Sequence, residues 1–254
     1  MITVTFDSNV WEEIVDETKR SKKLIYQLIF NHIKEKKIEP FFFEGLAVHE
    51  NILKNNRKDF IGNFKATIII EIENDKPDIT EGSPAPVLIE YLKENIPKAL
   101  ELGFKFIWTP RIGSPCLNIS NQYKAPDKKH SQNVRLERTF ECAKFIESLG
   151  AGKANLHNKL DSCGKRGIVT QTKEDKSLNK KQYGNGVAEW VDGDAIAAHY
   201  GFDIDYFCTN DQAKRAGTAS IFHPNNLRKI SEKYDIKVIS PSDLLELLDK
   251  RLLK

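Results

Sequence analysis

The sequence predicts an α/β fold with a central parallel sheet, and three observations support this. Runs such as ITVTF at 2–6 and IEPFFF at 38–43 are rich in β-branched and aromatic residues, as buried strands are. They alternate with stretches such as 22–36, where apolar residues recur along one helical face. The 254 residues are 40% hydrophobic and 30% charged, a composition typical of a globular chain. Strands that alternate with helices favour a parallel sheet covered on both faces.

The first third of the chain reads as strand, helix, helix, strand and helix. Asp7-Ser8-Asn9 ends the strand at 2–6, because these residues favour turns and helix N-caps. We expect a helix from about Val10, a second helix at 22–36 and a strand at 38–43. Gly45 then separates that strand from a helix at 46–58, which contains Glu50.

The last quarter repeats the alternation. We expect a helix from Asp192, as its cap, to Tyr200, with Gly201 as its end. A strand at 206–209, a helix that ends at 231–234, a strand at 237–239 and a final leucine-rich helix after Ser240 complete it.

The middle of the chain differs in composition. Residues 60–185 hold most of the prolines and two polar, basic stretches, at 121–133 and 173–182. We expect strands and helices here too, at 67–72, 87–102, 104–108 and 136–149. This predicts a large α/β insertion with flexible basic loops, so that 1–59 and 186–254 form the core and 60–185 an inserted subdomain.

Composition and motifs argue against several classes of function. No apolar run is long enough for a membrane span, and the start of the chain does not read as a secretion signal, so we expect a cytoplasmic protein without membrane contact. The four cysteines contain no C-x-x-C pair, which argues against a zinc site. Gly150-Ala151-Gly152-Lys153 lacks the first glycine and the final Ser or Thr of a phosphate-binding P-loop.

Acidic residues recur where the predicted strands end. Asp7 and Asp211 each follow a strand, and Glu50 lies in the helix after the second strand, with Glu44 as an alternative closer to that strand. Asp192 and Asp194 both precede the strand at 206–209. Ligands of open parallel sheets bind beyond the carboxyl ends of the strands, so we expect these carboxylates to share one cleft.

Several carboxylates held together repel one another, and a cation is the usual compensation. Oxygen ligands suit Mg²⁺ or Mn²⁺, which promote attack of water on a phosphodiester. We therefore expect Asp7, Glu50, Asp194 and Asp211 to be catalytic metal ligands. The side chains expected to orient them are Ser8, Asn9, Thr209 and Asn210, with Asp192 as the alternative third acid.

In order, FDSNV at 6–10, the helical Glu50, DGDAIAAHYGFD at 192–203 and FCTND at 207–211 resemble the four acidic motifs of PIN-domain nucleases. The tail KYDIKVISPSDLLELL at 233–248 resembles the end of that family's domain. The resemblance implies a three-layer PIN-like fold and a metal-dependent endoribonuclease with Asp7, Glu50, Asp194 or Asp192, and Asp211 as its acids. In the family the third acid shortly precedes an Ile-Ala-Ala-like run, and by that pattern the spacing to Ile196 favours Asp194. It covers 1–59 and 186–254, about half of the chain.

The resemblance also implies partners. RNA is the expected substrate, with DNA open as an alternative, and the role would be that of a toxin with a protein antitoxin or inhibitor, or of an RNA-processing enzyme. A homodimer stays open. Two other functions compete: a phosphatase with Asp7 as nucleophile, although Asn9 stands where such enzymes have a second Asp, and a non-catalytic RNA- or protein-binding module on a degenerate nuclease fold.

Overall fold

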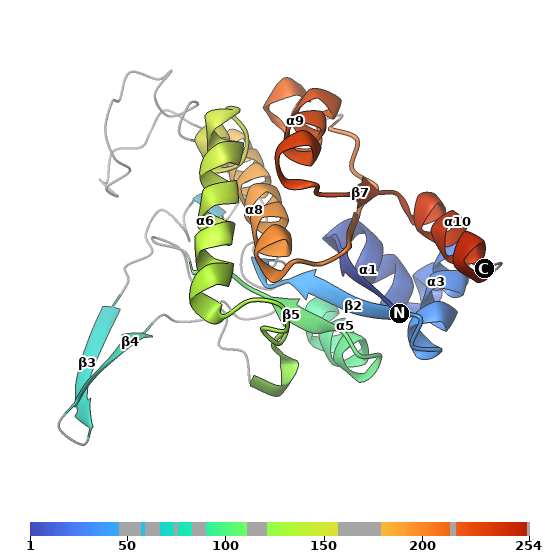
Figure 1. Cartoon of the computed structure of the whole chain (residues 1–254), viewed down its shortest axis with the longest axis horizontal. Coiled ribbons are helices and arrows are strands. Elements are labelled where there is room, and N and C mark those ends of the chain that lie inside the picture. The colour runs from blue at the N-terminus through green and yellow to red at the C-terminus, as the bar shows by residue number, and fades with distance from the viewer. Residues whose placement is uncertain are drawn as a thin grey trace.

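The computed structural model describes most of the chain (Figure 1). The described residues are 1–45, 57–58, 67–73, 76–82, 90–110, 121–156, 179–213 and 217–252. The statements below concern these residues.

Five parallel strands form the central sheet. They are β1 (Ile2–Phe6), β2 (Ile38–Phe43), β5 (Lys105–Ile107), β6 (Tyr206–Cys208) and β7 (Val238–Ile239). Their order across the sheet is β5-β2-β1-β6-β7, and every pair of neighbours is parallel. This confirms the α/β class and the central parallel sheet predicted from the alternating strands and helices.

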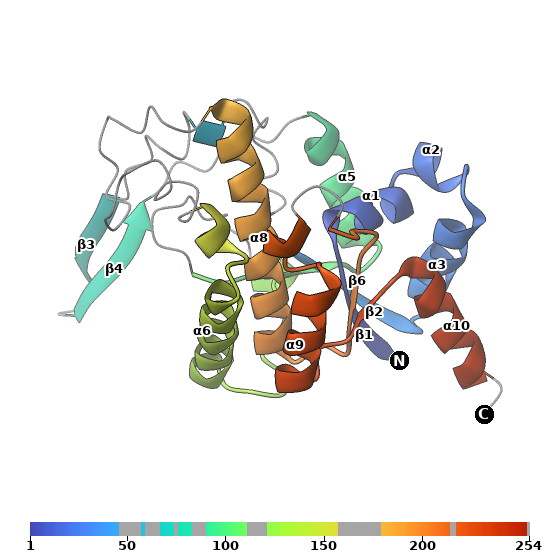
Figure 2. The same cartoon turned by 90° about the horizontal axis from the view of Figure 1, so that it is seen from above.

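Helices cover both faces of the sheet (Figures 1 and 2). On one face lie α1 (Ser8–Val15), α3 (Leu24–Lys34), α5 (Glu90–Glu101) and α10 (Pro241–Leu252). On the other lie α6 (Gln132–Ser148), α8 (Lys180–Phe202) and α9 (Pro224–Tyr234). The short α2 (Glu17–Arg20) connects α1 to α3. Two 3₁₀ turns lie at Asn121–Tyr123 and Gly217–Ala219.

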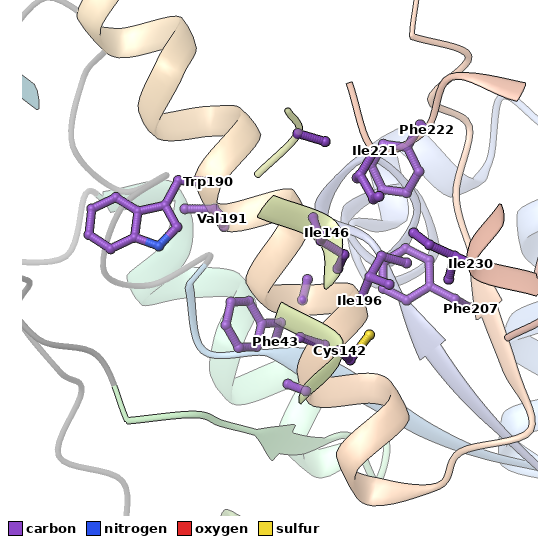
Figure 3. Packing of buried hydrophobic residues seen from close by; sticks show 14 of the residues in the cluster. Phe43, Cys142, Ile146, Trp190, Val191, Ile196, Phe207, Ile221, Phe222 and Ile230 are labelled. Carbon is purple, nitrogen blue, oxygen red and sulfur yellow. The ribbon is translucent and has the colours of Figure 1, made fainter. Parts of the chain in front are cut away.

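Two hydrophobic cores follow from this three-layer arrangement. Successive side chains of a strand point to opposite faces, and β2 shows it: Phe42 joins the core under α1 and α3, whereas Phe41 and Phe43 join the core under α6 and α8. In Figure 3, Phe207 of β6 packs in this second core near Ile196 of α8. Both faces of the sheet are therefore buried, as is usual for parallel sheets.

The described parts of 60–185 do not stand apart from the rest of the chain. Strand β5 pairs with β2 in the central sheet, α5 belongs to the core under α1, and α6 packs beside α8. Only β3 (Thr67–Glu73) and β4 (Lys76–Gly82) form a sheet of their own, an antiparallel pair. Residues 90–110 and 121–156 thus complete the same layers as the two ends of the chain, and an inserted subdomain with the bounds 60–185 stays a prediction.

Most predicted elements agree with the structure to within a few residues, but α8 does not. The helix begins at Lys180, twelve residues before the expected start at Asp192. Asn179 caps it: its side chain accepts a hydrogen bond from the Gln182 N–H, and the Gln182 side chain accepts one from the Asn179 N–H. Asp192 is therefore an interior helix residue, and its predicted role as the N-cap is wrong.

Among the described helices, none is both long enough and apolar enough to cross a lipid bilayer.

Candidate active site

The candidate site lies at the carboxyl edge of the sheet, between β1 and β6. From β1, the chain passes through β2 to β5 on one side, and β6 leads to β7 on the other. The strand order thus reverses at β1 and β6. In open α/β sheets, the crevice outside the carboxyl ends of such strands is the usual ligand site, and Asp7 and Thr209 are the first residues after these two strands.

Four hydrogen-bond donors hold the Asp7 carboxylate. Its Oδ1 accepts a hydrogen bond from the Ser8 N–H at 2.7 Å and is 3.4 Å from the Ser8 hydroxyl. Its Oδ2 accepts one from the Thr209 hydroxyl and one from the Asn9 amide, both at 2.6 Å. Asp7 is also the N-cap of α1. The structure therefore brings Asp7, Ser8, Asn9 and Thr209 together, as the sequence predicted.

A second set of bonds ties the two strand ends to α3. The Asn210 N–H donates to Asn9 Oδ1 at 2.9 Å, and the Asn210 side-chain amide donates to the Asn9 carbonyl at 3.2 Å. The same amide donates to the Tyr26 hydroxyl at 3.0 Å, and Tyr26 is a buried residue of α3. The sequence analysis missed Tyr26, since no strand end or acidic motif marks it. Tyr26 holds Asn210, and Asn210 in turn holds Asn9 in the orientation in which its amide donates to Asp7.

Asp211 lies in the loop after β6, two residues after Thr209. Its N–H donates to the Thr209 hydroxyl oxygen at 2.9 Å, and its own Oδ1 accepts a bond from the Ala213 N–H at 2.6 Å. The Thr209 hydroxyl therefore links Asp211 to Asp7. The negative charge of Asp211 also raises the pKa of Asp7.

A small cavity next to Asp7 shows which of the two acids of α8 faces Asp7. The cavity holds about 20 Å³, room for one water-sized group, and Asp7, Ser8 and Asp192 line it together with apolar residues of the sheet. Two of these, Phe43 and Phe207, are shown in Figure 3. Asp194 is absent from its lining. Residues two apart on a helix point about 200° from each other, so α8 presents only one of the two acids here, and the geometry favours Asp192.

The environment of Asp7 disfavours its charge. Burial raises the pKa of Asp7, the hydrogen bonds from Thr209, Ser8 and Asn9 lower it, and the negative charge of Asp211 raises it again. The net direction is upward. In the described part of the chain, no lysine or arginine forms an ion pair with Asp7 or Asp211.

The second predicted acid stays untested. Glu50 lies outside the described residues. Glu44, the alternative, directly follows β2 and is buried, and its backbone N–H donates a hydrogen bond to the Ile107 carbonyl of β5. Within the described ranges, no three His, Cys, Asp or Glu side chains meet closely enough to hold one metal ion.

The donors that are present suit magnesium or manganese better than a metal that needs a full protein cage. Mg²⁺ keeps several waters and is usually held by one or two carboxylates and the phosphate of its substrate. Asp7 and Asp192 supply two carboxylates around one cavity, and Asp211 adds negative charge beside them.

Comparisons with protein-family models, with curated proteins and with solved structures gave no match to this chain. The functional interpretation therefore depends on the motifs and on the geometry of this edge of the sheet.

Proposed function

We propose that the chain is a PIN-like, metal-dependent endoribonuclease. The observation that carries this proposal is the Asp7 carboxylate: it lies half-buried at the carboxyl ends of β1 and β6, desolvation raises its pKa, Asp192 shares its cavity, and no described cation neutralises it. A bound divalent ion is a direct physical compensation for such an arrangement. The order of the four acidic motifs and the three-layer architecture agree with the resemblance to PIN-domain nucleases.

In this proposal, Asp7 and Asp192 would hold the ion, with Asp211 beside them. A divalent ion supplies two kinds of chemistry here: it promotes attack by water at phosphorus, and it stabilises the charge that develops on the phosphate oxygens. Thr209, Ser8 and Asn9 fix the direction of the Asp7 carboxylate, so that little reorganisation is needed when the ion binds.

One observation disfavours the rival phosphatase. An enzyme with Asp7 as nucleophile would use an acid two residues later to protonate the leaving group. Asn9 stands there instead. Its amide has no acidic proton to transfer, and it donates a hydrogen bond to Asp7 itself at 2.6 Å. The non-catalytic RNA- or protein-binding module is separated from the nuclease by the test below.

The test is cleavage by the purified chain. Total RNA and a panel of single- and double-stranded DNA are incubated with Mn²⁺ or with EDTA, for the wild type and for Asp7→Asn. We expect RNA to be cut only with Mn²⁺ and the variant to lose at least about 100-fold in rate, the scale of losing one catalytic group. RNA binding without cleavage in Mg²⁺ or Mn²⁺ would instead support the non-catalytic module.

A further inference from the structure

Tyr26 is the buried end of a chain of hydrogen bonds that leads from α3 to the Asp7 carboxylate. Its side chain belongs to the hydrophobic core under α1 and α3, and the residue is only 4% exposed. Helix α3 packs beside α1 and α10 on this face of the sheet (Figure 2). The core therefore fixes the Tyr26 ring, and the hydroxyl at its end has a defined position.

The Tyr26 hydroxyl binds the loop after β6. The Asn210 side-chain amide donates to it at 3.0 Å, and among the described residues this amide is the only hydrogen-bond partner of the hydroxyl. The same amide donates to the Asn9 carbonyl at 3.2 Å. Asn210 is exposed, so packing does not fix its side chain. These two bonds hold Asn210 between α3 and the start of α1.

Asn210 in turn orients the side-chain amide of Asn9. The Asn210 N–H donates to Asn9 Oδ1 at 2.9 Å, so Asn9 Nδ2 is the atom that faces Asp7, and it donates to Asp7 Oδ2 at 2.6 Å. An amide turned the other way would place its oxygen against the carboxylate, where two acceptors repel each other. Because Asn9 is exposed, its orientation depends on these bonds and not on packing.

The Asn9 bond is the part of the Asp7 environment that depends on Tyr26. Thr209, which donates to the same Asp7 oxygen, is itself buried in the strand end, and Ser8 donates from its backbone. If Asn210 moved, these two donors would remain, but Asp7 Oδ2 would lose the second of its two short bonds. The carboxylate would then be free to rotate over a wider range.

We propose that Tyr26 is a positioning residue of the candidate active site: through Asn210 and Asn9, its hydroxyl fixes the direction of the Asp7 carboxylate and so strengthens the binding of a divalent ion. This rests on the proposed function, in which Asp7 holds the ion. Side chains that orient the ligands of a metal usually contribute about 10- to 100-fold to its affinity. Tyr26 acts through two further side chains, so its contribution is expected to be smaller.

A purely structural role makes a different prediction. A buried tyrosine hydroxyl needs a hydrogen-bond partner wherever it lies, so the bond to Asn210 could serve the stability of the fold alone. In that case, removal of the hydroxyl would lower Tm but change neither the affinity for a metal ion nor the mobility of the Asn9 amide.

The test uses Tyr26→Phe, which removes the hydroxyl and keeps the ring in the core. Tyr91→Phe is the matched control: the Tyr91 hydroxyl accepts a hydrogen bond from Lys19 at 2.8 Å, and its ring packs against the same core. The described hydrogen bonds of this group lead on to Glu12 and not to Asp7.

Two measurements are made on each full-length variant. Electron paramagnetic resonance of free Mn²⁺ gives the Kd of the ion. In metal-free protein labelled with ¹⁵N-asparagine, NMR gives the rate at which the side-chain amide protons of Asn9 exchange with water. Thermal unfolding reports the stability of each variant separately.

We expect Tyr26→Phe to raise the Kd for Mn²⁺ about three- to tenfold and to accelerate exchange of the Asn9 amide. Tyr91→Phe should keep both values of the wild type. Asn210→Ala should raise the Kd at least as much as Tyr26→Phe. The double variant should equal Asn210→Ala, because the hydroxyl acts through Asn210 and the two effects do not add.

A wild-type Kd for Tyr26→Phe would overturn the positioning role, even if its Tm fell. A raised Kd with unchanged exchange of the Asn9 amide would overturn the route through Asn9. A wild type that binds Mn²⁺ but cuts no RNA would overturn the nuclease and leave the role of Tyr26 to be decided by the Kd values. A wild type that binds no Mn²⁺ would overturn both the metal site and this role.

Discussion

The acidic residues at the two edges of the central sheet differ in their ion pairs. At the amino edge, Asp203 pairs with Lys129 and Arg138, and Asp235 pairs with Lys237. At the carboxyl edge, no ion pair neutralises Asp7 or Asp211 within the described ranges, and desolvation raises the pKa of the half-buried Asp7. Within the described residues, ion pairs thus neutralise acids at the amino edge, whereas Asp7 and Asp211 at the carboxyl edge are held by hydrogen bonds alone.

The buried His199 of α8 makes its polar and aromatic contacts within the protein. It is only 1% exposed, its Nδ1 is hydrogen bonded to the Thr5 hydroxyl at 2.9 Å, and it lies edge-on to Phe207. Burial lowers the pKa of His199 to about 3, although the charges of Asp205 and Asp203 act in the opposite direction. The imidazole is therefore neutral at physiological pH. A polar cavity of about 170 Å³ adjoins it, but its described acids have basic or hydrogen-bonding partners.

The largest expected effect distinguishes the two acids of α8. Asp192→Asn should reduce kcat/KM for RNA cleavage by at least about 100-fold, because Asp192 shares the cavity with Asp7. Asp194→Asn should cost less than about fivefold, since that residue points elsewhere on the helix. Steady-state kinetics in Mn²⁺ measures both. The reverse ranking would show that the spacing to Ile196, and not the cavity, identifies the third acid.

The next effect concerns the metal itself. Mn²⁺ at about 100 times its Kd should stabilise the wild type by about 2.7 kcal/mol and raise its Tm, since it binds the folded chain. Asp7→Asn should lose most of this response, and Asp203→Asn at the amino edge should keep it. Differential scanning fluorimetry with and without Mn²⁺ reports the three responses. An equal rise in Tm for Asp7→Asn would locate the ion somewhere other than this cavity.

Acid should weaken the fold through His199. The folded-state pKa of about 3 lies below the usual unfolded value of about 6.5, so below pH 6.5 the unfolded chain binds the proton more readily. The contribution of His199 is fully present above pH 6.5 and falls by about 2 kcal/mol between pH 7 and pH 5. Urea unfolding at both pH values measures it. His199→Gln should lose about that part of the pH dependence, and an unchanged pH dependence would contradict the assigned cause.

The smallest effect is expected from Asp205. Its Oδ2 accepts hydrogen bonds from the Thr3 N–H and the Thr3 hydroxyl, both at 2.8 Å, and so joins the starts of β1 and β6. Asp205→Ala should lower the free energy of unfolding by about 1 kcal/mol, the usual worth of such exposed bonds. Metal-dependent cleavage should stay unchanged. A large loss of cleavage would show that the two edges are not independent.

The strands were predictable from the sequence because their composition is local. Runs such as ITVTF and the three phenylalanines of β2 fit a surface that is buried on both sides. The acids at the strand ends could be read for the same reason, because a turn residue after a buried strand marks the edge of the sheet. Tyr26 could not, since only the folded chain brings α3 to Asn210.

The start of α8 was missed because its first half has weak helix formers. Gly184 and Gly186 lower helix propensity, yet Gly186 packs against Leu156, where a side chain would not fit. The Asn179 and Gln182 capping box was the readable signal. This error also affected the site: a helix that begins at Asp192 leaves its first acids at a terminus, whereas a continuous helix makes Asp192 and Asp194 face different ways.

The bond between Thr5 and His199 has a consequence for distances along α8. His199 is seven residues after Asp192, so the two share one side of the helix and are separated by about 10.5 Å along its axis. Thr5 is likewise two residues before Asp7 on β1. The bond thus sets how far α8 can slide along β1, and a slip of one residue would change the spacing of the Asp192 and Asp7 oxygens by about 1.5 Å. A shift of that size is a large fraction of an ion–oxygen distance, so the bond between Thr5 and His199 would matter for the proposed ion site although neither residue carries a carboxylate.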